Sequence, residues 1–363
     1  MAWKLLRLTP LKPFFFGKQK VFTNTNYASS EYFPQQTQLS GALRAYLLET
    51  QGHLKVHKHG KFCAKEETEN ANKLTGKANS SDFAINDDLG MIDFISPMFI
   101  LKKLDNSTLS AYFPIPSDIV ENDNKNLLYA TPNKINSIVC SDTATVFLKN
   151  YNVKNGFKSG FGDCQFWKNY IENSKILPFI DESEIFTTYD QVGIGLEEYG
   201  KKVKEEQFYT KKSYMLKPSF EFGVLLNLRD EVEISSGIFA LGAETSTFKL
   251  VVEDIPEYFF EHPIIEIFTN PFEKQEGKKL VLLSDAMLEN SLQQESYYQI
   301  ISSKVPFKMM TTSDDKMKQS YQKTELKSLV AKGSIYYYDN DTSLPQAKGA
   351  YKKMGFNQYL AIK

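Results

Sequence analysis

Two different spacings of apolar residues near the start of the chain predict a strand followed by a helix. Residues 3–9 (WKLLRLT) have the character of a strand, which Pro10 ends. In 40–49 (SGALRAYLLE) the apolar residues recur three or four positions apart, which is the spacing of one helix face. We expect Ser40 to be the N-cap of this helix, because its hydroxyl can accept a hydrogen bond from the first turn.

The second half of the chain predicts mostly strands. Two extended runs within 191–216 flank a charged centre, which is typical of a long hairpin with a basic tip. The run 220–228 (FEFGVLLNL) predicts a buried strand, and 246–253 alternates as a strand does. The segment 231–242 predicts a helix that Gly242 ends, although its β-branched residues weaken this interpretation.

Taken in chain order, these elements give the βαββαβ arrangement of a ferredoxin-like or RRM-like domain. We therefore predict an α+β protein with two ferredoxin-like domains, a large insertion and a protruding β-hairpin. The first domain covers 1–253 and contains the insertion at about 52–188 and the hairpin 191–216. The second, smaller domain covers 254–363.

Charge is distributed unevenly along the chain. The formal net charge is −1, yet residues 1–65 contain ten Lys or Arg and two acids, a net charge of +8. The remainder therefore carries −9. Such a split indicates a polyanion bound on one side and a protein partner on the other. Chance sorting of surface charge is the alternative.

Cysteine usage and the N-terminal sequence indicate a cytoplasmic protein. The three cysteines are far apart and include no CxxC pair, which fits free thiols in a reducing compartment. Charged residues and prolines interrupt the apolar N-terminal run, and no apolar run reaches the length of a membrane span. We expect no cofactor. We also expect no metal, since the spacing of His53, His57, His59 and Cys63 matches no zinc pattern.

Four stretches of the sequence, in order from end to end, carry a family resemblance. They are LKPFFFGKQKVF with YFPQQTQLSGALRAYLL (11–48), QVGIGLEEYGKKVKEEQFYTKKSYML (191–216), LGAETSTFKL (241–250), and LVAKGSIYYYD with MGFNQYLAIK (329–363). Together they resemble the third Cmr subunit of type III-B CRISPR complexes, within the RAMP superfamily. The chain departs from the family pattern at Gln191, where Arg is usual, and at Ala243, where a second Gly is usual.

The resemblance implies a non-catalytic RNA-binding subunit that acts in antiviral defence. Such subunits have two ferredoxin-like domains, cap the base of the effector filament and hold the 5′ handle of the guide (CRISPR) RNA. They also dock on the large polymerase-like Cas subunit and on a backbone RAMP subunit. A hairpin "thumb" typically reaches toward the guide.

Holding single-stranded RNA requires cations for phosphates, backbone N–H groups at glycine turns or helix N-termini, and aromatic faces for unstacked bases. We predict four groups of such residues, and each has a structural alternative as core, cap, solvated tip or tight turn. The groups are the loop and helix residues Phe16, Gly17, Lys18, Lys20 and Arg44; the helix start Gln35, Gln36, Thr37 and Ser40; the hairpin residues Lys201, Lys202, Lys204 and Tyr209; and the C-terminal turns Lys332, Gly333, Lys353, Gly355, Phe356 and Asn357.

Two other functions remain open from the sequence. One is a RAMP endoribonuclease that processes CRISPR precursor RNA, which would need a general acid–base group such as a histidine. His262 stands alone in EHPII, and the GxSxG, Walker A and HExxH motifs are absent. The other is an adaptor that contacts only proteins.

Overall fold

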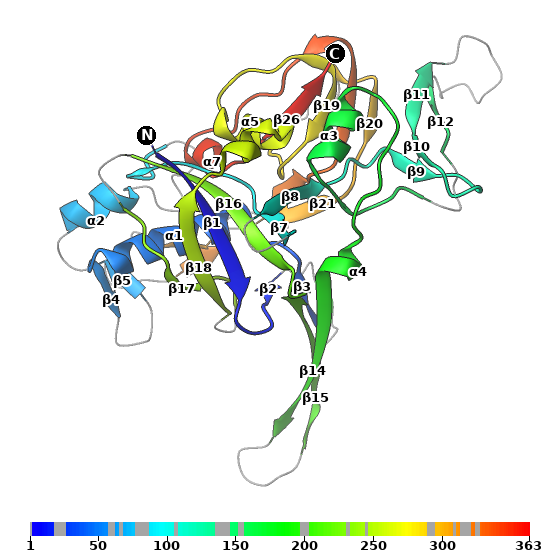
Figure 1. Ribbon diagram of the computed structural model, residues 1–363. Coiled ribbons are helices and arrows are strands. Elements are labelled where there is room, and N and C mark those ends of the chain that lie inside the picture. Colours follow the sequence, from blue (N-terminus) through cyan, green and yellow to red (C-terminus); the bar gives the residue numbers. More distant parts are fainter. Residues whose placement is uncertain are drawn as a thin grey trace.

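The computed structural model shows a mixed α+β fold, rich in strands and poor in helices, as predicted (Figure 1). Most of the chain is described, and the statements below concern that part. The described residues are 2–17, 27–56, 62–64, 68–76, 87–104, 108–134, 146–151, 156–196, 203–229, 233–243, 246–288, 295–307, 310–312, 321–323 and 327–363. No helix among them is long and apolar enough to cross a membrane.

An eight-stranded sheet forms the centre of the molecule. In spatial order its strands are β13 (Phe161–Gly162), β8 (Leu109–Pro114), β7 (Phe99–Lys103), β16 (Phe220–Leu228), β1 (Ala2–Pro10), β18 (Thr247–Asp254) and β17 (Gly237–Ala240), and β6 (Ile92–Ile95) also pairs with β16. The strands predicted at 3–9, 220–228 and 246–253 are thus confirmed. All nine residues of β16 are buried, which explains its continuous apolar sequence.

The alternation of side chains along β1 supplies both faces of this sheet. Leu6 and Leu8 join the core that packs against the first helix, α1 (Gln36–Thr50). Leu5, which points the other way, joins a second core with Trp167. Trp167 lies on α3 (Cys164–Ile171), and this core also contains side chains of α5 (Pro263–Thr269). The sheet is therefore covered on both faces around its central strands.

Two expectations for this region differ from the structure. Part of the segment 52–188, predicted as an insertion, supplies β6, β7, β8 and β13 to the central sheet, since its apolar runs fill both cores. The helix predicted over 231–242 is wrong. Residues 237–240 instead form β17, where Phe239 is buried and each residue pairs with one on β18. The β-branched and aromatic side chains there suit a strand.

The helix predicted at 40–49 is confirmed, but it begins earlier than expected. α1 starts at Gln36, and Gln35 is its N-cap, with its backbone N–H donating to the Gln38 side chain at 3.2 Å. Ser40, expected to cap the helix, lies within it and is 1% exposed. The helix begins before Ser40 because the side chains of Gln35 and Gln38 each accept a hydrogen bond from the other residue's backbone N–H, which caps the first turn.

The long hairpin predicted at 191–216 is confirmed and projects from the body of the molecule (Figure 1). Its strands are β14 (Phe186–Leu196) and β15 (Val203–Leu216), paired antiparallel. β15 also runs parallel to β3 (Tyr27–Glu31), which pairs with β2 (Phe16–Gly17). This small sheet joins the base of the hairpin to the segment that leads into α1.

The C-terminal part contains a second sheet, of four strands. Its spatial order is β20 (Tyr298–Ile300), β25 (Ile335–Thr342), β19 (Gly277–Leu282) and β26 (Tyr359–Ile362). Short two-stranded pairs surround the two large sheets: β4 (Leu54–Val56) with β5 (Phe62–Ala64), β9 (Ile119–Glu121) with β10 (Leu127–Tyr129), β11 (Thr131–Lys134) with β12 (Val146–Lys149), β21 (Lys304–Phe307) with β24 (Lys327–Val330), and β22 (Met310–Thr312) with β23 (Tyr321–Lys323). The remaining helices are α2 (Thr68–Thr75), α4 (Glu182–Ile185), the 3-10 helix η1 (Glu257–Glu261) and α7 (Ala350–Lys353).

Candidate nucleic-acid interface

A cleft of about 500 Å³ lies where the start of α1 meets the C-terminal part of the chain. It brings together Gly17, Gln35, Gln36 and Lys332, four predicted RNA contacts from three of the four groups. Its remaining wall comes from segments that are distant in sequence: 31–34, 97–98, 114–115, 117, 157–161, 182, 284–285 and 301–305, with Ala331. The cleft therefore gathers more of the predicted residues than the other described cavity, which Asn357 lines, and we take it as the candidate site.

Lys332 is the central cation of this cleft. It follows β24 in a turn with Gly333, whose φ of 84° suits glycine. The Lys332 ammonium lies 3.7 Å from the centroid of the Phe33 ring, and the Lys332 backbone N–H donates to the Asp285 carboxylate at 3.2 Å. The Gly333 carbonyl accepts from the Ser117 N–H at 2.9 Å, which fixes the turn against the opposite wall.

The surroundings of Lys332 change its acid–base properties. Burial lowers the pKa of Lys332 to about 8, although the carboxylates of Asp285 and Glu31 oppose this shift. Burial also raises the pKa of Asp285. At neutral pH Lys332 is therefore mainly charged, and a phosphate that entered the cleft would replace the lost solvation of its ammonium.

The first turn of α1 forms another wall of the cleft. No acidic residue lies in that turn, so the partial positive charge of the helix N-terminus is not offset there. The Gln35 side chain donates to the Pro306 carbonyl at 3.2 Å, and the Gln36 side chain donates to the Met354 carbonyl at 2.8 Å. These bonds tie the helix start to the C-terminal part and hold the wall in place.

Charge in the cleft is balanced rather than strongly basic. Three lysines line it, Lys158, Lys304 and Lys332, together with three acids, Glu31, Glu182 and Asp285. Lys158 is paired with Glu121. Such a lining favours an RNA segment that is recognised by its shape over non-specific binding of any polyanion.

Several predicted RNA contacts are instead part of the protein interior. Phe16, predicted as a stacking ring, is 1% exposed and packs against Phe14 and Phe248, because β2 lies against the core. Arg44 donates to the carbonyls of Thr75 (2.9 Å) and Gly76 at the end of α2, and burial lowers its pKa. The described bonds of Arg44 thus give it a structural role.

The C-terminal turn is also structural. Phe356 is 1% exposed, and the Lys353 ammonium lies 3.9 Å from a carboxylate oxygen of Asp93. Asn357, at φ 58°, accepts from the Met287 N–H at 2.7 Å and is buried. Gly355 lies close to both α1 and β6. A Cβ there would lie 3.1 Å from the side-chain amide nitrogen of Gln36 on α1 and 2.5 Å from the backbone carbonyl oxygen of Ile95 on β6. This turn supports the cleft from behind.

Some predicted contacts are not placed in the cleft. Thr37 and Ser40 do not line it, and Ser40 is buried within α1. Lys18, Lys20, Lys201 and Lys202 lie outside the described residues, as do the side chains of Lys204 and Tyr209. His57 and His59 also lie outside them, and no group of three metal-binding side chains occurs in the described part.

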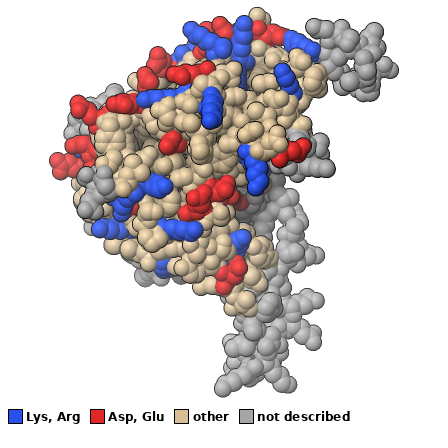
Figure 2. All heavy atoms as spheres, turned by 45° about the vertical axis from the view of Figure 1, so that its right-hand side comes forward, with Lys and Arg blue, Asp and Glu red and all other residues tan. Residues whose placement is uncertain are grey.

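The charge split along the sequence does not become two oppositely charged faces among the described residues. Lys4 pairs with Asp254 at 2.7 Å, and Arg7 pairs with Glu221 at 2.8 Å and Glu253 at 3.2 Å. These two N-terminal cations are thus neutralised by acids from the rest of the chain. In Figure 2, acidic and basic side chains are interspersed over the face that is shown.

Sequence reasoning missed several cleft residues, namely Phe33, Phe157, Lys158, Asp285 and Lys304. A signal for some of them exists in 155–163 (NGFKSGFGD). It interleaves rings, a cation and glycines much as the predicted loop beginning at Phe14 does. Asp285 and Lys304 carry no comparable local signal, since only the fold brings them to the cleft.

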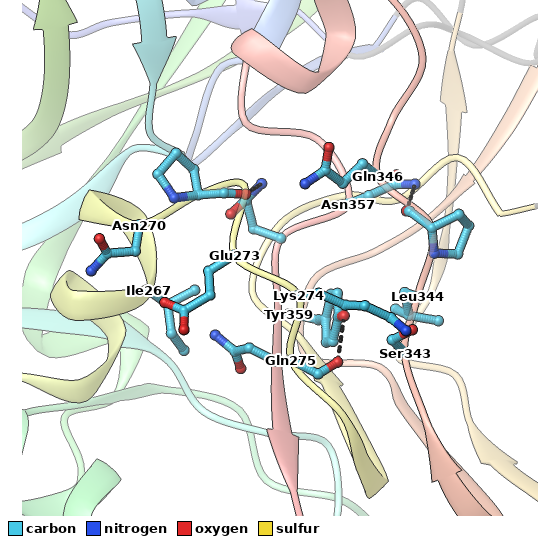
Figure 3. A pocket seen from close by; sticks show the side chains of 13 residues that line it. Ile267, Asn270, Glu273, Lys274, Gln275, Ser343, Leu344, Gln346, Asn357 and Tyr359 are labelled. Atoms are coloured by element: carbon cyan, nitrogen blue, oxygen red, sulfur yellow. Dashed lines mark hydrogen bonds between the residues drawn. The ribbon is translucent and has the colours of Figure 1, made fainter.

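A second cavity, of about 430 Å³, lies in the C-terminal part (Figure 3). Several of its polar side chains already bond within the protein. The Tyr359 hydroxyl donates to the Gln275 carbonyl and the Gln346 side chain donates to the Phe272 carbonyl, both at 2.8 Å. Of the two cavities described, the first cleft alone combines a half-buried cation, a helix N-terminus and an aromatic ring.

The fold is shared with known CRISPR effector proteins. A chain of the type III-B Cmr-beta complex bound to cognate target RNA has a TM-score of 0.53 with 15% sequence identity, over 99% of this chain and 96% of that chain. A chain of Cmr-beta bound to target RNA and AMPPnP gives 0.51 at the same identity and coverage. At this identity the likeness shows the fold alone. Among curated proteins, none matches the chain.

The family is shown by sequence. The model of the family described as CRISPR-associated protein (Cas_Cmr3) matches residues 6–363, nearly the whole chain. The protein therefore belongs to the Cas_Cmr3 family, which confirms the resemblance found in the sequence.

Proposed function

We propose that this protein is a non-catalytic subunit of a type III-B CRISPR effector complex and holds the 5′ handle of the guide RNA in the cleft at the start of α1. One observation carries the proposal for the site: the Lys332 ammonium and the N-terminus of α1 line the same cleft, beside the Phe33 ring. A phosphate and an adjacent unstacked base need these groups together. Membership of the Cas_Cmr3 family supports the assembly.

The proposal extends to partners. The two solved chains named above come from Cmr-beta complexes bound to target RNA, which supports a place beside RNA and other subunits. We propose that this chain docks on the large polymerase-like subunit and on a backbone RAMP subunit. The projecting hairpin β14–β15 would reach toward the guide or toward one of these neighbours (Figure 1).

The strand order supports the origin of the fold from two ferredoxin-like units. Counting four strands along the chain within each unit, the central sheet contains β18-β1-β16-β7 and the C-terminal sheet contains β26-β19-β25-β20. Both follow the order fourth, first, third, second. In the first unit α1 lies between the first two strands, and in the second α7 lies between the last two. We propose two modified ferredoxin-like domains on this ground.

The alternative, a ribonuclease, has little support from the environment of His262. His262 is 3% exposed and accepts from the Ile264 N–H at 3.2 Å at the start of α5. Burial lowers its pKa to about 3, so it is neutral and removed from solvent at physiological pH. A general acid–base group needs a pKa near the working pH and access to substrate.

Binding of handle RNA to the assembled complex tests the proposal. Lys332→Met should weaken binding about tenfold or more and reduce the salt dependence by about 0.7 units of slope, since one phosphate contact is lost. Lys278→Met, at an exposed lysine that does not line the cleft, is the matched control. Equal affinities for Lys332→Met and the control would reject the cleft as the site. Specific cleavage of repeat RNA by the protein would favour the nuclease instead.

A further inference from the structure

Two exposed aromatic rings stand together at the rim of the cleft. Phe157 lines it and is 38% exposed, and Tyr151 beside it is 37% exposed. Their ring centroids are 4.8 Å apart, with 35° between the planes. The two rings contact each other, and each is partly exposed. One face of each ring is therefore not covered by the other.

The backbone holds both rings in place. Phe157 forms an isolated bridge with Val120, and the next N–H, of Lys158, donates to the Ile119 carbonyl at 2.8 Å. Before Tyr151, the Asn150 side chain donates to the Tyr129 carbonyl at 3.0 Å. The backbone at Phe157 and the residue before Tyr151 are therefore both anchored on the β9–β10 region, so the pair is prearranged.

The cleft wall next to Phe157 indicates what would cover it. The cleft lining contains small and polar residues, namely Ser117, Ser159, Gly160, Ser302 and Ser303, beside apolar ones such as Ile115 and Ile301. Lys158 and Lys304 line the same cleft. Small polar residues with cations allow close approach of a sugar–phosphate backbone, whereas the centre of a protein interface is usually apolar and well packed.

We propose that the Tyr151–Phe157 pair is a stacking platform for one unstacked base of the RNA strand that continues out of the cleft. This inference rests on the proposed function, because it places a second nucleotide beside the one held at Lys332. A base would lie on the outer face of Phe157, with Tyr151 supporting the ring from the side. Stacking of this kind tolerates any base, since each has a π face.

Handle RNA that carries 2-aminopurine at one position at a time tests the platform, because this base loses fluorescence when it stacks. We expect quenching at one position on binding to the complex, and recovery of fluorescence in Phe157→Leu. Affinity for handle RNA should fall about fivefold to 150-fold in Phe157→Leu. Phe157→Tyr keeps a ring and should retain both quenching and affinity.

The matched control is Phe147→Leu, at a ring that is 47% exposed on β12 and does not line the cleft. Unchanged quenching and affinity in Phe157→Leu, with weakened binding in Lys332→Met, would overturn the platform and leave the proposed function standing. Loss of subunit assembly in Phe157→Leu with RNA affinity intact would assign the pair to a protein partner and also overturn it. No binding of handle RNA by the wild-type complex would reject both proposals.

Discussion

The buried pair of Asp118 and Lys279 should contribute strongly to stability. Asp118 is 0% exposed, and one of its carboxylate oxygens lies 2.6 Å from the Lys279 ammonium. The carboxylate also accepts from the hydroxyls of Tyr170 at 3.1 Å and Tyr337 at 3.3 Å. These partners come from α3, β19 and β25, so the cluster joins the central part of the chain to the C-terminal sheet.

Removal of the cation alone leaves a carboxylate buried without a counter-charge. We expect Lys279→Met to lower the free energy of unfolding by about 3–5 kcal/mol. Replacing both groups, in Asp118→Asn with Lys279→Met, should cost less than the sum of the two single changes, because no charge is then left alone. The difference measures the coupling between the two side chains.

Urea unfolding followed by tryptophan fluorescence provides the assay. Trp167 lies fully buried on α3, one turn from Tyr170, and Trp3→Phe removes the only other tryptophan. With a slope of about 3 kcal/mol per molar urea, the midpoint should fall by roughly 1–1.7 M. The control is Lys274→Met, whose pair with Glu276 is exposed and should contribute little to stability. If Lys279→Met costs no more than that control, the account of the buried cluster is refuted.

Three further predictions concern the cleft and its support. RNA affinity, measured by anisotropy, should fall as pH rises through about 8, since Lys332 then loses its proton. The free energy of unfolding attributable to Lys332, measured in urea, should rise between about pH 8 and 10, because its lowered pKa means that the unfolded chain binds more protons there. Lys332→Met should flatten both pH profiles. Arg44→Met should lower the free energy of unfolding by about 1–3 kcal/mol, because the carbonyls at the end of α2 lose their hydrogen bonds to Arg44. RNA affinity of the folded protein should be unchanged. A selective loss of RNA affinity would contradict this. Gly355→Ala should cost about 1–3 kcal/mol in thermal unfolding because its φ is 76° and a Cβ would meet the Ile95 carbonyl at the end of β6. A neutral effect would show that the turn can move away from β6.

Regular patterns explain which parts of the fold the sequence predicts. β1, β16, β18 and the long hairpin carry continuous or alternating apolar runs, and α1 carries a helix face, so local information defines them. The sequence favours a helix at β17 because four residues at the edge of a sheet leave too short a strand pattern. The sequence does not indicate that β6 and β7 belong to the central sheet, because their partner, β16, is more than one hundred residues away.

The candidate site was predictable in residue type but not in exposure. Gln36 and Lys332 are almost three hundred positions apart, and the sequence indicated both as candidates without showing that they share a cleft. It could not show that Phe16 and Arg44 face inward, since a ring or a cation in a basic segment suits either a core or a ligand. Only the packing of β2 and of α2 distinguishes these cases.

Photocrosslinking of the guide RNA within the assembled complex tests the central claim most directly. A guide with 4-thiouridine at each handle position in turn would be irradiated, and the crosslinked peptides of this subunit would be identified by mass spectrometry. We predict crosslinks within 31–36, 157–161, 301–305 and 331–334, which form or adjoin the cleft at the start of α1. Handle crosslinks that map only to other subunits, or only to surfaces of this chain away from the cleft, would contradict the account.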